Sequence, residues 1–135
     1  MADIQALRTG LAANLSTIPG LRVVKDIPDQ PNPPVAIVQF SRVEYHLTSQ
    51  NGMAEYTFAI QVLVGRVDER TGQRNLDAYC SSDSASSIRR AVESNRTLSG
   101  VAFDCIVTDM SSYGSMVMND ITYLAAEFSV RVLAS

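Results

Sequence analysis

The side chains best suited to nucleophilic chemistry in this sequence are the thiols of Cys80 and Cys105. A catalytic thiol needs a neighbouring base, and histidine is the common choice. The chain has a single histidine, His46, which falls near a predicted hairpin tip. Cys80 shares the helical phase of Leu76 and Ile88, and Cys105 alternates with apolar residues in a strand pattern. We therefore interpret both cysteines as buried structural thiols.

Other patterns that could carry catalysis are equally weak. Asp68 and Glu69 are adjacent in a predicted loop, and adjacent side chains rarely converge on one substrate atom. The sequence contains no glycine-rich phosphate loop and no residues at metal-ligand spacing. The serine run at 81–87 could be a modification target, but small polar residues also suit a helix that packs closely on a sheet. We predict no catalytic residues, no bound metal and no cofactor.

Composition indicates one ordinary globular domain. The chain has 135 residues, of which 46% are hydrophobic and 19% charged, enough to bury about two-thirds of the unfolded chain's surface. A formal net charge of −3 does not favour electrostatic attraction to phosphate backbones or anionic lipid. No apolar run approaches the ~20 residues of a membrane span. The N-terminus lacks an apolar signal core, so we expect synthesis in the cytoplasm with free thiols.

The first half of the chain predicts a helix, a strand and a hairpin. Apolar residues three or four apart mark a helix from Ile4 to Ile18, with Asp3 as a candidate N-cap, and Pro19-Gly20 ends it. Residues 21–25 predict a short strand. Residues 26–34 hold four of the five prolines and predict a connector. Two alternating runs then flank Asn51-Gly52, a strong hairpin signal, and predict a long two-stranded arm.

The second half predicts one helix and two strands. The helix begins at Arg74 or Asn75, and its inward face is formed by Leu76, Tyr79, Cys80, Ser84, Ile88, Ala91 and Val92. Residues 101–110 predict a strand with Val101, Phe103, Cys105 and Val107 on one face. Residues 121–133 predict a cleaner strand, in which Leu124, Ala126, Phe128, Val130 and Val132 face the core. The whole order predicts an α+β fold, with an antiparallel or mixed sheet of about five strands, two helices on one face and an extended β-hairpin.

Two segments predict contacts with other protein chains. An isolated two-stranded ribbon is marginally stable in water, so a long hairpin arm normally packs on something. Residues 109–120, expected to be a connector, contain three methionines, whose flexible side chains suit irregular contact surfaces. The candidate contact residues lie in the hairpin tip, the loop after the long strand and this late segment: Asn51, Met53, Arg70, Arg74, Tyr113, Met116 and Met118.

Residues 65–100 resemble the middle of tail terminator proteins from long-tailed (siphovirus) phages of actinobacteria, related to the lambda-type terminators. There a strand ends in a polar loop with an arginine, and a helix with a pattern like "LDAY…SIRRAVE" precedes a "TL-G" turn. The closing Tyr113-Gly114 and "YLAAEFSVRVL" are also similar, while the serines at 81–87 depart from the pattern. The matching positions in this sequence are Arg70, Gln73, Leu76, Asp77, Tyr79, Ile88, Arg89, Ala91, Glu93, Leu98 and Gly100.

The resemblance implies a structural virion protein of the phage neck, with no enzymatic activity. Such terminators form a hexameric ring on the tail tube, stop its polymerisation and provide the docking surface for the head–tail connector or stopper. A closed ring requires one patch to meet a different patch on its neighbour. The implied partners are five copies of the chain, the tail tube protein and the connector. DNA passes through such a ring without specific binding, and no membrane is involved.

Four alternatives stay open. A head–tail stopper or adaptor, or a tail tube subunit, would have a similar composition. A small cytoplasmic enzyme with Cys80 as its nucleophile predicts a low thiol pKa and rapid alkylation of the folded protein. A ligand-binding module predicts a monomer with a concave apolar pocket.

Overall fold

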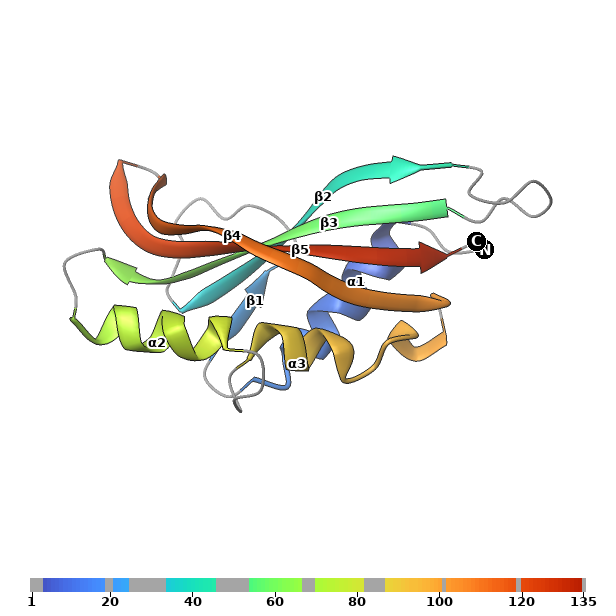
Figure 1. Ribbon diagram of the computed structural model, residues 1–135, viewed down its shortest axis with the longest axis horizontal. Helices are drawn as coiled ribbons and strands as arrows, with labels where there is room; N and C mark the ends of the chain where they lie inside the picture. Colours follow the sequence, from blue (N-terminus) through green and yellow to red (C-terminus); the bar gives the residue numbers. More distant parts are fainter. Residues whose placement is uncertain are drawn as a thin grey trace.

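The computed structural model describes residues 4–18, 21–24, 34–45, 54–66, 70–81, 87–100, 102–118 and 120–134. It confirms an α+β fold with a five-stranded mixed sheet (Figure 1). The elements follow one another as α1 (Ile4–Leu15), β1 (Arg22–Val24), β2 (Val35–Glu44), β3 (Ala54–Arg66), α2 (Arg70–Cys80), α3 (Ile88–Glu93), the 3-10 turn η1 (Leu98–Gly100), β4 (Asp104–Met118) and β5 (Ile121–Ala134).

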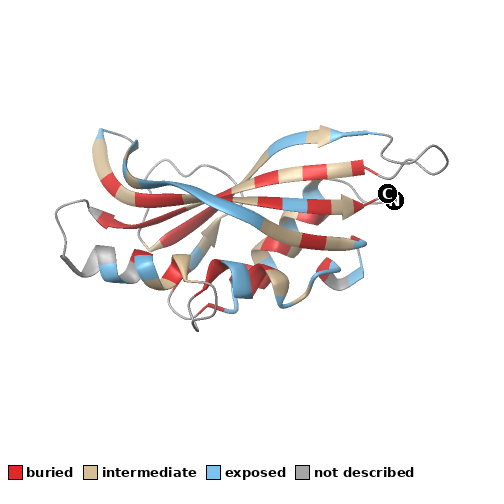
Figure 2. Ribbon diagram, in the orientation of Figure 1, coloured by how far each residue is buried: buried red, intermediate tan, exposed pale blue. Residues whose placement is uncertain are grey.

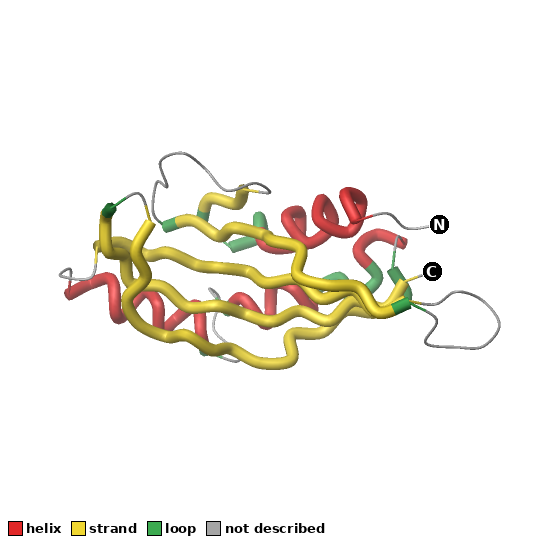
Figure 3. Tube along the Cα trace, turned by 90° about the horizontal axis from the view of Figure 1, so that it is seen from above, coloured by secondary structure: helices red, strands yellow, loops and turns green. Residues whose placement is uncertain are grey.

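The sheet has the strand order β1-β2-β3-β5-β4. Its only parallel pair among the described strands is β1 with β2, and the pairs β2–β3, β3–β5 and β4–β5 are antiparallel. The short β1 and the long β4 are therefore the two edges. The strands run side by side along the long axis of the molecule (Figure 3).

The main hydrophobic core lies between the sheet and the three helices, which all cover the same face (Figure 1). Leu7, Leu11 and Leu15 of α1 are fully buried, as their spacing predicts. In β3 and β5 buried residues alternate with partly exposed ones (Figure 2), so that Phe58 and Ile60 face the helices while Ala59 and Gln61 face away. The predicted inward face of β5, from Leu124 to Val132, is confirmed, since these residues belong to the main core or pack against it.

A second, smaller cluster is buried on the opposite face of the sheet. It contains Val35, Ile37, Leu63, Tyr123 and Ala125, with Val24, Met116 and Ile121 packed against them. The sequence predicts burial on one face of β2, yet residues 35–38 are all buried. Here the sheet is covered on both faces, so the side chains on both sides of this part of β2 are apolar.

The prediction of one helix from Arg74 or Asn75 through Val92 is wrong, because α2 runs from Arg70 to Cys80 and α3 begins at Ile88. Ser87 has an extended backbone with φ −64° and ψ 125°, and its Oγ accepts a hydrogen bond from the Arg90 N–H at 3.2 Å. Serine competes for helix N–H groups in this way and so favours helix starts. The segment therefore forms α2 and α3, and three helices rather than two cover the sheet. Leu76, Tyr79, Ile88, Ala91 and Val92 are buried as predicted, whereas Ser84 lies outside the described residues.

The prediction of a two-stranded hairpin arm is also wrong for the part of it that the structure describes. The hairpin pairing itself is confirmed as far as Glu44 with Glu55. However, β5 pairs with the other side of β3 from Ala54 to Arg66, so β3 is a central strand. The tip, with His46, Asn51 and Met53, lies outside the described residues, as do Asp3, all but the last residue of the connector predicted at 26–34, and the Asp68-Glu69 pair.

The predicted late connector at 109–120 is instead the second half of β4, which continues to Met118. Its alternation is broken by register shifts between Val107 and Asp109 and between Ser111 and Gly114. After each bulge the following side chains point to the opposite face of the sheet from the one that strict alternation predicts, so the sequence no longer shows a strand pattern. Phe103 precedes the strand and is exposed, contrary to its predicted place in the core. Among the described residues, no helix is long and apolar enough to span a membrane.

Candidate interaction surface

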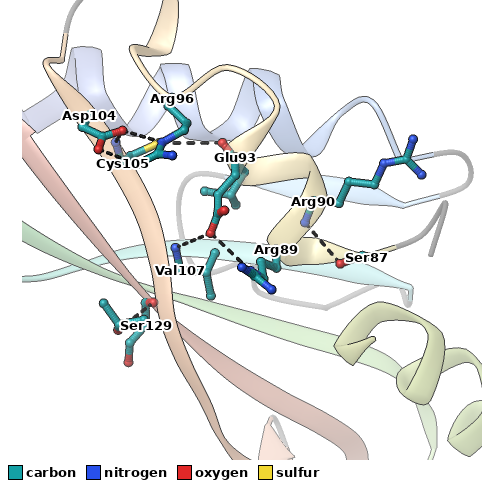
Figure 4. Close-up of polar contacts among 11 residues, drawn as sticks. Ser87, Arg89, Arg90, Glu93, Arg96, Asp104, Cys105, Val107 and Ser129 are labelled. Carbon is teal, nitrogen blue, oxygen red and sulfur yellow. Dashed lines mark hydrogen bonds and ion pairs between the residues drawn. The ribbon is translucent and has the colours of Figure 1, made fainter. Parts of the chain in front are cut away.

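The first half of the outer edge of β4 is closed by α3 (Figure 4). The Glu93 carboxylate accepts a hydrogen bond from the Val107 N–H at 3.1 Å. It also forms an ion pair with the Arg89 guanidinium at 3.5 Å. The Cys105 thiol lies 3.7 Å from the carbonyl oxygen of Val92. A free N–H on an edge strand invites pairing with another chain, and here a side chain occupies it.

A bidentate ion pair between Arg96 and Asp104 fixes the segment between α3 and β4. Both Arg96 Nε and Nη2 donate to the Asp104 carboxylate at 2.6 Å (Figure 4). The Arg96 guanidinium holds the pKa of the Asp104 carboxyl below its ordinary value, first through the hydrogen bonds and then through its charge. Both side chains are substantially exposed, so the pair fixes geometry more than it adds stability.

The second half of β4 carries a row of exposed apolar side chains. Met110 is 38% exposed, Tyr113 41% and Val117 67%. Met110 is paired with Phe128, a residue of the main core, so it lies on the helix side of the sheet. Val117 is paired with Thr122, two residues before Leu124, which packs against the same core, so Val117 lies on that side too. We call Met110, Tyr113 and Val117 the apolar row.

The apolar row is tied to α2 by one hydrogen bond. The Tyr113 hydroxyl donates to Asp77 Oδ1 at 2.5 Å, across 36 positions of the sequence. A short bond from a hydroxyl to a carboxylate is charge-assisted and stronger than a neutral one. Arg74, one turn earlier on α2, is exposed as well. The row thus meets the exposed side of α2 at Tyr113.

The structure brings together only some of the predicted contact residues. Arg74 and Tyr113 lie on this surface, whereas Met116 points to the other face and packs against the second cluster. Arg70 begins α2 and Met118 ends β4, and the description does not include their side chains. Sequence reasoning missed Asp77, Met110 and Val117 as surface residues. For Met110 and Val117 the available signal is the apolar content of residues 109–120, for which the sequence predicts a connector, and no local signal marks Asp77.

Cys105 is buried as predicted, whereas Cys80 is only partly buried, and neither thiol has the lowered pKa of a nucleophile. Burial raises the pKa of Cys80 to about 11, and the nearby Asp77 carboxylate adds to this effect. The pKa of Cys105 is raised to about 11, again mainly by burial. A catalytic thiol needs a lowered pKa. A small cavity of about 40 Å³ beside Cys105, lined by Asp104, Ile106, Arg131 and Leu133, is far smaller than the ~300–1,000 Å³ of typical ligand pockets.

No protein-family model and no curated protein matches the chain. The resemblance to tail terminators therefore depends on the sequence motifs alone.

Proposed function

We propose that this chain is the tail terminator of a long-tailed phage. In this proposal six copies form a ring that caps the tail tube, stops its polymerisation and presents a docking surface to the head–tail connector. The protein acts in the virion neck and performs no catalysis.

The observation that carries the proposal is the apolar row on the outer edge of β4. Monomeric proteins expose single apolar residues freely, but a row along one sheet edge beside an exposed helix is typical of a protein contact surface. The thiols, with raised pKa values, give no support to the alternative of a thiol enzyme.

Ring closure also fits the asymmetry of the sheet. A cyclic hexamer joins two different patches, one from each neighbour. The two edges of this sheet differ strongly, since β1 has three residues and β4 has fifteen. In the proposed ring the apolar row is one of the two patches, and Arg74 lies at its border.

The test combines mass measurement with electron microscopy. The purified protein is weighed in solution with and without purified tail tubes, and the mixtures are imaged by negative stain. A sixfold ring at one end of each tube supports the proposal. Long tubes formed by the chain alone would identify a tube subunit, and binding to the connector without the tube would identify a stopper. A monomer that ignores both would refute the proposal.

A further inference from the structure

The sheet carries a bend line that crosses three strands. Gly65 of β3 is paired with Leu124 of β5, and Gly114 of β4 is paired with the adjacent Ala125. Both glycines follow register shifts, and their φ angles are 156° and 151°. Side-chain-bearing residues rarely adopt such angles. Two independent irregularities therefore flank the same point of β5.

Beyond this line the β4–β5 hairpin has almost no backbone pairing with the rest of the sheet. We call residues 115–118 of β4 and 121–123 of β5 the arm. Past Gly65, β3 contributes one further pair, Arg66 with Tyr123. The arm curls away from the helices toward the opposite face (Figure 1). A two-stranded ribbon is marginal in water on its own, so its position depends on what it touches.

The concave side of the arm covers the second cluster. Met116, Ile121 and Tyr123 come from the arm, and they pack against Val35, Ile37 and Leu63 of the sheet. Tyr123 is almost completely buried in this position. The arm thus covers an apolar face of the sheet that would otherwise be exposed to solvent.

The pivot itself is fixed from the other side of the sheet. Tyr113 directly precedes Gly114, and its hydroxyl is bonded to Asp77 of α2. Ser112, in the same bulge, has a φ of 56°. The bulge therefore has a conformation that few residues favour, and the contact with α2 stabilises it.

We infer that the arm is a hinged cover of the second cluster, which pivots about the Gly65–Gly114 line and is held closed by the Tyr113–Asp77 hydrogen bond. Opening presents the apolar side chains of Ile37 and Leu63, and closing withholds them. This inference does not depend on the proposed ring, because it concerns the isolated chain.

The test uses two methionines of β4 as reporters. Met110 is exposed on the helix side, and Met116 is packed against the second cluster. Dilute peroxide converts accessible methionine to its sulfoxide, and mass spectrometry gives the rate at each position. In the wild-type protein Met116 should oxidise more slowly than Met110. Tyr113→Phe should speed oxidation of Met116 by at least about twofold, the smallest effect expected for one lost hydrogen bond, and leave Met110 unchanged.

Matched variants separate the hinge from general loosening. Asp77→Asn keeps an acceptor oxygen and should have a smaller effect than Asp77→Ala. Asp109→Asn alters an exposed carboxylate of the same strand and should change neither rate. Circular dichroism verifies that each variant is folded.

Hydrogen exchange of the wild-type protein provides a test that needs no variant. Amides at 121–123 should exchange faster than those at 126–132 of the same strand, because only the former open with the arm. Equal exchange along β5 would overturn the inference. So would a Met116 rate that matches Met110 in the wild type, or one that Tyr113→Phe leaves unchanged.

Discussion

The side-chain amide of Asn14 in α1 donates a hydrogen bond of 2.9 Å to the carbonyl oxygen of Val92 in α3, 78 positions later. The same amide donates to the carbonyl of Asn95 at 3.0 Å. The last carbonyls of a helix have no partner within it, and here a buried side chain from another helix bonds that of Val92, while Asn95 lies in the turn after α3. One polar residue thus joins two helices that the sequence separates widely.

Replacing Asn14 with alanine should destabilise the fold by about 1–3 kcal/mol, because it removes a buried hydrogen bond to the Val92 carbonyl and a partly buried one to the Asn95 carbonyl. Urea unfolding measures the free-energy change. Thr9→Ala, at an exposed position of the same helix, should change stability by less than about 0.5 kcal/mol. Equal losses in the two variants would contradict this role of Asn14.

Gly10→Ala should destabilise the protein, although alanine usually favours a helix over glycine by roughly 0.5–1 kcal/mol. A Cβ at Gly10 would lie 2.8 Å from the Cβ of Leu98, a buried residue with a φ of 51°. We expect a net loss of about 1–3 kcal/mol from overpacking. Thermal unfolding would detect it, and a higher melting temperature than wild type would show that α1 shifts to accommodate the methyl group.

The thiols should react slowly in the folded protein. Because the pKa of both cysteines is about 11, very little thiolate exists at pH 8. Iodoacetamide labelling should therefore be much slower in buffer than in urea, and faster as the pH approaches 11. Rapid labelling of Cys80 at pH 7 in the folded state would support the alternative that the protein is a thiol enzyme.

The same shifts predict a loss of stability in alkaline solution. Between pH 9 and 11 the unfolded chain releases its thiol protons while the folded chain keeps them. Unfolding then releases protons, so the free energy of unfolding falls as the pH rises. A Cys80→Ala/Cys105→Ala variant should show a weaker decline over this window, as measured by urea unfolding at each pH.

The Arg96–Asp104 ion pair predicts an effect in acid. Its hydrogen bonds lower the folded pKa of Asp104, so its contribution is present above the unfolded value of about 3.9 and is lost as the pH falls through the folded value. Asp104→Asn should therefore be less stable than wild type at pH 7 and equally stable near pH 2. A difference that persists at pH 2 would mean that packing, not charge, is responsible.

The sequence predicted the elements whose pattern is regular and missed those in which local chemistry interrupts it. The alternation in β5 and the helical spacing of Leu7 and Leu11 follow from one buried face. The extent of β4 could not be predicted, because two bulges and Gly114 disturb its period. The Tyr113–Asp77 contact depends on how far β4 extends, so no local pattern shows it. The pairing of β3 with β5 likewise depends on residues some seventy positions apart, as in Phe58 with Val130.

The last prediction concerns Val117, the most exposed residue of the apolar row. Val117→Asp places a charge on the outer edge of β4, where the side chain makes few contacts within its own chain. Stability should change by less than about 0.5 kcal/mol, whereas assembly should fail, because an unpaired charge buried in an interface is costly. Ala13→Asp, on an exposed position of α1, should leave assembly intact. Sedimentation with purified tail tubes measures both variants. If Val117→Asp still caps tubes as well as Ala13→Asp does, the apolar row is not the ring contact, and the assembly surface must be sought on another part of the chain.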